Sequence, residues 1–435
     1  MRSKENPLRT IFYREINDVI AFKKQLLQWS QQFREIVFLD SNDYNQKYSN
    51  YDLILAVDAF TSVETDYYNA FQDLYEYQSR TKDWLFGYLT YDLKNDIEKL
   101  SSNNFDGLSF PDLFFFQPKK LFLLKDTTLE IQYLQMCDDE FETDFNEILN
   151  IARQPSIDNV QPIINQRISK ENYLNKVSKM LEHIQRGDIY EANFCMEFFA
   201  ENAQINPILV YQKLNSISQP PFAVYFKNNQ HFLLSASPER YLKKEGNKIV
   251  SQPIKGTAKR FEDEVLDNQS KIDLENNPKE RSENIMIVDL VRNDLSHTAT
   301  KGSVEVEELC KIYTFKQVHQ MISTIVSNVE PNTSPIEIIK TTFPMGSMTG
   351  APKISAMNII ENLEETKRGL YSGSVGYFTP IGDFDFNVII RSILYNAEAN
   401  YLSFSVGSAI TSKSIPENEY EECLLKAKAM FEVLS

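Results

Sequence analysis

An alternating strand followed by a hairpin pattern constrains the fold of this chain more than any other feature of its sequence. Apolar residues occupy every second position from Tyr190 to Phe198, which places their side chains on one face of a strand. Two apolar runs, Phe222–Phe226 and Phe232–Leu234, flank a polar turn and predict a hairpin. Three more strands with short turns are expected at Tyr371–Thr379, Phe384–Tyr395 and Tyr401–Ile410. These patterns predict a large antiparallel sheet.

Helices are predicted at both sides of this strand-rich stretch. Ser169 is placed to cap a helix that ends at Gly187, and the prolines Pro278 and Pro416 each start a further amphipathic segment. The first part of the chain alternates short apolar runs with helical patterns, and the composition turns polar and proline-containing around residues 154–166. We therefore expect an α+β protein of two packed halves, residues 1–160 and residues 161–435.

Composition excludes several classes of partner. The chain has 435 residues and a formal net charge of −16, and its lysines and arginines are scattered, so neither nucleic acid nor anionic lipid has a basic surface to bind. No run of about 18 apolar residues predicts a membrane span, and no signal-peptide pattern is evident, so we expect a cytoplasmic protein. Its four cysteines lack the spacing of a zinc site and are interpreted as reduced packing thiols.

Two pairs of glutamates are candidates for holding a metal ion. Glu280 and Glu283, and likewise Glu419 and Glu422, are three residues apart near the start of predicted helices, so each pair shares one helix face. Four converging carboxylates would repel each other unless a hard cation lay between them, and magnesium prefers oxygen ligands. The alternative is that these acids cap their helices, since Asn277 precedes Glu280 by three residues.

A lysine in an unusual setting is a candidate nucleophile. Lys255 lies in the stretch Ser251–Thr257, at the end of an apolar strand, between a proline and a glycine. Burial would disfavour its charged form, and a neutral amine acts as a nucleophile or a base. The alternative is a lysine that extends its charge from the strand end to solvent.

Arg391 is a candidate anion ligand. Its predicted strand carries Ile389 and Ile393 on the same face, so a permanent charge points where apolar groups point and requires a carboxylate. That carboxylate is either a structural aspartate or part of a substrate.

Three further features are less specific. The stretch Gly346–Lys353 leads into a helix, as suits a bound carboxylate or hydroxyl, but it lacks the spacing of a phosphate loop. His319 is either a packed polar residue or a catalytic one. Glu239 is either a carboxylic acid with a raised pKa or a partner for Arg240.

The order of these features resembles the chorismate-utilising family, which includes anthranilate, aminodeoxychorismate, isochorismate and salicylate synthases. The resemblance runs from about Ser169 to the C-terminus, with a looser match at Phe86–Asp92. The stretches that carry it are Gly187–Tyr190, Ser237–Arg240, Pro253–Thr257, Glu283–Asp294, Gly350–Lys353 and Glu419–Glu422. It implies an α+β fold of large antiparallel sheets forming a β-sandwich flanked by helices, with the active site between the halves.

The resemblance also implies roles for individual residues. Glu283 and Glu422 would be magnesium ligands, with Glu280 and Glu419 acting through water, and Arg391 would hold the enolpyruvyl carboxylate of chorismate. Further substrate contacts are implied for His319, Ser347, Gly407, Ser408, Ala409, Tyr377 and Thr257. Glu239 would be the general acid at the departing 4-hydroxyl group.

Lys255 distinguishes between the family's reactions. Members that aminate chorismate at C4 carry this lysine as a covalent nucleophile, whereas the anthranilate and isochorismate enzymes typically carry a small residue there. Isochorismate and salicylate synthases place a water-activating lysine at the position where this chain has Glu191. The absence of that lysine disfavours water as the nucleophile. Amine-using relatives usually carry glutamine at that position, so Glu191 is a departure, as is the pair Ser408–Ala409 where glycines are common.

The expected reaction is therefore amination of chorismate at C4, with anthranilate formation and hydroxylation to isochorismate or salicylate as alternatives. Nothing in the chain resembles a glutamine amidotransferase, so ammonia would come from a separate glutaminase subunit or from solution. A separate aminodeoxychorismate lyase would complete the conversion to 4-aminobenzoate, a precursor of folate.

Overall fold

The computed structural model describes residues 8–44, 47–151, 161–316 and 318–435. Its strands are β1 (Arg9–Glu15), β2 (Glu35–Asp40), β3 (Leu53–Thr65), β4 (Leu85–Leu89), β5 (Leu113–Lys125), β6 (Thr128–Leu134), β7 (Asn165–Gln166), β8 (Glu191–Ala200), β9 (Phe222–Asn228), β10 (His231–Ser237), β11 (Arg240–Glu245), β12 (Lys248–Gln252), β13 (Ile254–Lys259), β14 (Glu305–Thr314), β15 (Val318–Asn328), β16 (Gly350–Ala351), β17 (Ser374–Phe378), β18 (Phe384–Val388), β19 (Ser392–Asn396) and β20 (Tyr401–Thr411).

The α-helices are α1 (Val19–Ser30), α2 (Ala70–Thr81), α3 (Lys94–Ile97), α4 (Phe141–Asn150), α5 (Lys170–Arg186), α6 (Pro207–Ser218), α7 (Glu264–Asn276), α8 (Pro278–Ser296), α9 (Pro335–Thr342), α10 (Lys353–Leu363) and α11 (Pro416–Leu434). Three short 3₁₀ helices are η1 (Tyr91–Leu93), η2 (Gln135–Glu140) and η3 (Gly346–Met348). Within the described residues, no helix is both long enough and apolar enough to cross a membrane.

The strands pair antiparallel in two runs that share one long strand. The first run follows the order β1-β6-β5-β3-β2-β9-β10-β19-β20-β8, and the second follows β4-β17-β18-β11-β12-β15 with β13 and β14 also on β15. Strand β5 pairs with both β3 and β4 and so joins the runs. The predicted α+β class with large antiparallel sheets is confirmed.

The two halves predicted from the sequence share these sheets. Strand β2 pairs with β9, and β4 pairs with β17, so N-terminal strands lie inside both runs. The predicted boundary region falls partly on residues 152–160, which lie outside the described residues. The division into 1–160 and 161–435 stays a prediction.

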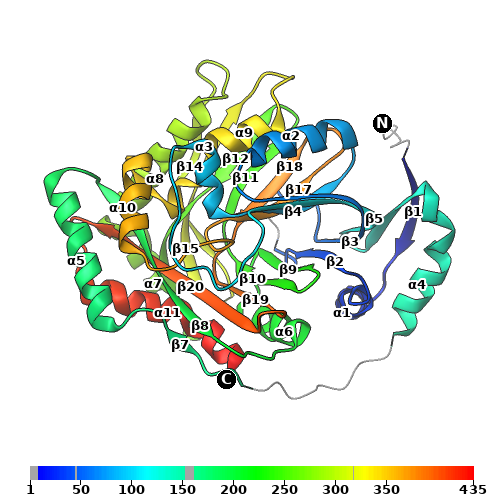
Figure 1. Ribbon diagram of the computed structural model, residues 1–435, viewed down its shortest axis with the longest axis horizontal. Helices are drawn as coiled ribbons and strands as arrows, with labels where there is room; N and C mark the ends of the chain where they lie inside the picture. Colours follow the sequence, from blue (N-terminus) through cyan, green and yellow to red (C-terminus); the bar gives the residue numbers. More distant parts are fainter. Residues whose placement is uncertain (1–7, 45–46, 152–160, 317) are drawn as a thin grey trace.

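Helices cover the outer face of the first run, and a second core fills the interior. Side chains from α1, α5, α6, α10 and α11 pack with the first run in one core, whereas α2, α8 and α9 contribute to a second core with residues from both runs. Figure 1 shows α5 and α11 against β8 and β20, and α1 and α4 beside β1 at the other end of the molecule. The strand ends near α8 and α11 lie outside these two cores, and the candidate site lies there.

The strand and helix patterns of the C-terminal half give the expected elements. Ala192, Phe194, Met196 and Phe198 of β8 enter the first core, as their alternation predicts. Ser169 caps α5 by accepting from a backbone N–H, and Gly187 ends that helix with a φ of 84°. The opposite face of β8 carries Glu191, Asn193 and Glu197, together with Cys195 and Phe199, which pack with the second core.

One predicted strand is wrong. Phe384–Tyr395 is not continuous, because the chain leaves β18 in the second run and enters β19 in the first run. Arg391 lies in this crossover with a φ of 51°, a left-handed conformation that is uncommon for residues other than glycine. Its carbonyl accepts from the backbone N–H of Ala236 at 3.1 Å. Arg391 is therefore presented by a bend between two sheets and not by a strand face.

Candidate active site

A cavity of about 1110 Å³ gathers most of the candidate residues. Its walls include the turn after β10, strands β13 and β20, the N-terminal turns of α8, and one side of α11 along most of its length. The candidates that line it are Glu239, Lys255, Thr257, Glu280, Glu283, Ser347, Arg391, Gly407, Ala409, Glu419 and Glu422. Residues separated by more than 180 positions in the sequence are therefore brought together by the sandwich.

Lys255 lies within this cavity and is ion-paired. Its Nζ is 3.1 Å from Oε1 of Glu191, and the two side chains are 12% and 2% exposed. The lysine stands on β13 and the glutamate is the first residue of β8, so the contact depends on two elements that are distant in the sequence. The snorkelling alternative is excluded, because the ammonium points inward.

The predicted loss of charge at Lys255 is wrong for the ligand-free site. Burial alone would lower the pKa of Lys255, but the carboxylates of Glu191, Glu283 and Glu239 outweigh it and raise the pKa above its ordinary value. The resting side chain is therefore an ammonium. A nucleophilic role would require that this ammonium first lose a proton.

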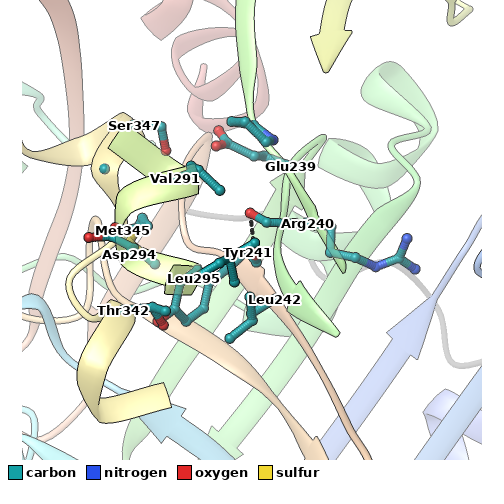
Figure 2. A pocket seen from close by; sticks show the side chains of 13 residues that line it. Glu239, Arg240, Tyr241, Leu242, Val291, Asp294, Leu295, Thr342, Met345 and Ser347 are labelled. Carbon is teal, nitrogen blue, oxygen red and sulfur yellow. Dashed lines mark hydrogen bonds between the residues drawn. The ribbon is translucent and has the colours of Figure 1, made fainter. Parts of the chain in front are cut away.

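Glu239 has the properties predicted for a general acid. It lies between β10 and β11, and burial raises its pKa to about 7, against the opposing effects of the Ser347 hydroxyl and the positive charge of Lys255. Figure 2 shows Glu239 and Ser347 beside a small cavity, which has a volume of about 20 Å³ and is otherwise lined largely by apolar side chains such as Val291 and Leu295. A carboxyl group in this setting holds its proton near neutral pH.

Arg391 supplies an uncompensated positive charge. Among the described residues, its guanidinium has no hydrogen bond or ion pair, although it lines the cavity. Burial lowers its pKa, and the charge of Glu239 opposes this effect. The alternative of a structural aspartate has no support among the described residues, where Asp385 pairs with Arg240 instead. The guanidinium of Arg391 is therefore available to an anion that enters the cavity.

The two glutamate pairs line one region of the cavity. Burial raises the pKa of Glu283 to about 7 and also raises that of Glu280. Lys279, which the sequence analysis did not single out, has its Nζ 3.8 Å from Glu283 and 3.5 Å from Glu419. The capping alternative is partly confirmed, because the Asn277 side chain accepts from the N–H of Glu280.

Helix α11 also contributes a positively charged side chain, Lys426. Lys426 lies 2.7 Å from Glu422 and donates to the carbonyl of Gly407 at 2.8 Å. Lys426 therefore lowers the pKa of Glu422, although burial alone would raise it. This contact also links the middle of α11 to β20, where the expected backbone contacts for substrate lie.

The glutamate oxygens are suitable donors for a divalent cation, but they are not already arranged as a closed binding site. Oε1 of Glu283 is buried and has no hydrogen-bond partner among the described residues, and all the candidate donors are the oxygens that magnesium prefers. Within the same part of the chain, no three His, Cys, Asp or Glu side chains are grouped closely enough to hold a metal. The carboxylates would have to draw together around an ion and displace Lys279.

Three predicted substrate contacts do not line the cavity. The ring of His319 is buried between Thr314 and Asp267, 3.0 and 3.1 Å from its two nitrogens. Tyr377 packs against Trp84 in the sandwich, and the Ser408 hydroxyl faces Tyr173 in the first core. Strand alternation explains Ser408, because its neighbours Gly407 and Ala409 take the cavity side.

Sequence reasoning missed several residues that line the cavity. Lys279 and Lys426 were detectable, since each is four residues from a glutamate on the same helix. Asn193 and Tyr371 gave no comparable signal, because the first lies within an apolar-looking strand and the second in a loop. The Asn193 amide donates to the carbonyl of Ser347 at 3.1 Å and so steadies the turn beside Glu239.

The fold brings carboxylates, lysines and arginines together around a large cavity. Comparison with known proteins identifies the family: the chorismate binding enzyme family matches residues 30–432. An anthranilate synthase component I-like protein of Synechocystis is 35% identical over 81% of this chain and 72% of its own length. A probable chloroplastic aminodeoxychorismate synthase of Oryza sativa is 39% identical over 61% of this chain, which spans only 30% of that relative.

A solved structure agrees with the fold. The crystal structure of anthranilate synthase component I from Streptococcus pneumoniae superposes with a TM-score of 0.77 at 23% identity, covering 89% of this chain and 93% of that one. The chain therefore belongs to the chorismate binding enzyme family, as its motifs predict.

Proposed function

We propose that this chain is component I of an aminodeoxychorismate synthase, which converts chorismate and ammonia to 4-amino-4-deoxychorismate. The observation that carries the proposal is the amine of Lys255 inside the cavity, opposite a buried acid, Glu239. Lys255 is buried and its charge is influenced by three carboxylates. Such clusters of interacting titratable groups are typical of functional sites and less typical of purely structural ones. Relatives named as aminodeoxychorismate synthases support the same choice.

Two groups would hold the two carboxylates of chorismate. Arg391 has no hydrogen-bond partner for its guanidinium among the described residues, and it would offer two parallel N–H donors to the enolpyruvyl carboxylate. Glu283 and Glu422 would hold a magnesium ion, with Glu280 and Glu419 acting through water. The ion would supply positive charge for the ring carboxylate. Ser347 and the backbone of Gly407 and Ala409 line the same space and would contact the substrate.

The chain's residues would carry out a double displacement. The neutral amine of Lys255 adds at C2, and the C4–O bond breaks as Glu239 protonates the departing hydroxyl group. Ammonia then adds at C4, the bond from C2 to Lys255 breaks, and Glu239 recovers a proton from the new amine. The product retains its enolpyruvyl group, so no pyruvate is released.

Trapping the covalent step tests this function. Protein incubated with chorismate and magnesium, but without ammonia, is digested and analysed by mass spectrometry. The peptide that contains Lys255 should gain the mass of chorismate minus water, and addition of ammonium should remove that mass. An unmodified Lys255 in an enzyme that still aminates chorismate would contradict the covalent role, and Lys255→Ala gives the background.

Anthranilate synthase is the second candidate, because the Synechocystis relative carries that name in its description. In that case Lys255 would be inert, and the same mixture with ammonium would release pyruvate and a fluorescent aromatic amine. Hydroxylation to isochorismate or salicylate is disfavoured by Glu191, which pairs with Lys255 instead of presenting a lysine to water.

The proposal includes partners. A component I acts with a glutamine amidotransferase subunit that supplies ammonia, and an aminodeoxychorismate lyase would convert the product to 4-aminobenzoate for folate synthesis. We expect all three in the cytoplasm. Co-purification of the chain with a glutaminase, and glutamine-dependent turnover of the complex, would test the first partner.

A further inference from the structure

Glu191 occupies the one hydrogen-bonding position next to Lys255 in the described part of the chain. Its Oε1 accepts from Nζ at 3.1 Å, and the contact spans 64 residues of sequence. The backbone of Glu191 is fixed from two sides, since it is paired with Ala351 of β16 and with Thr411 of β20. The carboxylate is therefore held in place by the sheet and not by Lys255 alone.

The second oxygen of this carboxylate is free. Oε2 of Glu191 is buried and has no hydrogen-bond partner among the described residues. Glu191 thus combines direct contact with the ammonium through Oε1 and a second oxygen, Oε2, that has no hydrogen bond to the described residues.

The other charged groups around Lys255 do not offer the same combination. Glu239 faces Lys255 from the turn before β11, and Glu280 and Glu283 face it from the start of α8. Glu422 faces it from α11. Glu239 is assigned to the leaving hydroxyl group, and the others to the cation. None of them forms a hydrogen bond with Nζ within the described residues.

We propose that Glu191 is a positioning residue that aims the Lys255 side chain and takes the proton its ammonium must lose. This inference rests on the proposed function, which requires a neutral amine.

The proton balance closes over one turnover. The ammonium of Lys255 transfers a proton to Glu191, and the neutral amine then bonds to C2 while Glu239 protonates the departing hydroxyl as water. When ammonia adds at C4, the C2–N bond breaks and returns the neutral amine, and Glu239 regains a proton from the C4 ammonium. Glu191 finally returns its proton to Lys255. The sum is chorismate plus ammonia giving the 4-amino product plus water.

Chemical labelling tests the pairing without any substrate. Cyanate carbamylates only neutral amines, so the labelling rate of Lys255 reports its neutral fraction. In Glu191→Gln the rate at pH 8 should rise about tenfold, which corresponds to one pKa unit. The exposed Lys24 serves as an internal reference, and Glu421→Gln, an exposed substitution of the same kind, is the matched control. Equal labelling in both variants and the wild type would overturn the pairing.

The pH dependence of turnover tests the proton transfer. In the wild type, the proton that Lys255 loses is transferred to Glu191 and stays within this pair. In Glu191→Gln, the same proton must be released to solvent. The ratio of variant to wild-type kcat should therefore start well below one near pH 6.5 and climb about tenfold per pH unit until Lys255 is neutral. The KM for chorismate should change little, because Glu191 does not line the cavity.

Two results would overturn the inference. A pH-independent kcat ratio, together with faster labelling, would show that Glu191 pairs with Lys255 but does not take its proton. A kcat above the wild type at all pH values would show that Glu191 only restrains the amine. Failure of the proposed function is distinguishable, because a wild type that makes no 4-amino product would still show the labelling difference.

Discussion

Two groups of charged residues face the cavity, and they differ in how their charges are compensated. The helix-borne group consists of Glu280, Glu283, Glu419 and Glu422, and its cations stand on the same helices four residues away. The strand-borne group, named for residues that lie on a strand or on a connection between two strands, consists of Glu239, Lys255 and Arg391. The charges that compensate this group come from distant parts of the chain or, among the described residues, are not hydrogen-bonded to it.

This difference indicates two tasks. The helix-borne group has more negative charge than its lysines balance, so it is suited to collecting a cation and the acidic part of a ligand. The strand-borne group has one nucleophile, one acid and one anion ligand, each held by a different element. Substitutions should therefore affect chemistry in the strand-borne group and binding in the helix-borne group.

The largest effect is expected at Lys255. Lys255→Ala should lower the rate of 4-amination at least about a thousandfold, because it removes the amine that is proposed to form the covalent intermediate. Binding of chorismate, measured by titration calorimetry in the presence of magnesium, should be largely retained. Turnover at the wild-type rate would remove the chemical role from the strand-borne group.

Glu239 should rank next, with a distinctive pH dependence. Glu239→Gln should lower kcat by about 10²–10⁴-fold, as expected for loss of a general acid. The acid acts in its protonated form and its pKa is raised to about 7, so wild-type turnover at a fixed concentration of NH₃ should decline as pH rises through 7. A profile of kcat against pH checks this, and the same decline in the variant would assign it to another group.

The helix-borne group is best tested through the metal. Glu283→Gln should abolish the magnesium response and lower activity about a hundredfold, because a neutral amide is a weak ligand. Binding of Mn²⁺, followed by electron paramagnetic resonance, should weaken in parallel without any substrate. Glu421→Gln, on the exposed side of α11, is the matched control. Full activity of Glu283→Gln in EDTA would remove the metal assignment.

Arg391 connects the two groups, because it binds substrate from the strand side. Arg391→Lys should raise the KM for chorismate about tenfold or more and lower kcat less, since an ammonium cannot offer two parallel donors to a carboxylate. Steady-state kinetics separate the two parameters. An unchanged KM would mean that the unpaired guanidinium has another ligand.

The smallest effect is expected at Lys279. Lys279→Met keeps the length of the side chain but removes the ammonium that lies between Glu283 and Glu419. The magnesium concentration for half-maximal activity should fall a few fold, because the ion no longer competes with a built-in charge. A higher magnesium requirement would show that Lys279 helps to assemble the site.

Local sequence patterns predicted the helix-borne group well and the strand-borne group less well. The starts of α8 and α11 follow from prolines and spaced glutamates, and their residues line the cavity as expected. The strand-borne group depends on which sheet each strand joins. The pattern around Arg391 reads as one strand, and only the crossover between β18 and β19 shows that the residue sits on a bend.

Tertiary contacts also explain the other differences. The charge of Lys255 depends in part on Glu191, 64 residues earlier, and no local signal links the two. The apolar strand pattern around His319 would be the same whether its ring faced a substrate or Asp267 of α7. In this structure the ring faces Asp267. The resemblance to a family carried the β-sandwich architecture, which periodicity alone did not specify.

Product identification tests the central claim most directly. The chain is incubated with chorismate, magnesium and ammonium at neutral to mildly alkaline pH, with and without an aminodeoxychorismate lyase, and the products are identified by mass spectrometry. A new amine that becomes 4-aminobenzoate only when the lyase is present is the predicted result. Anthranilate with pyruvate, or isochorismate or salicylate, would contradict the assignment of Lys255 as the nucleophile.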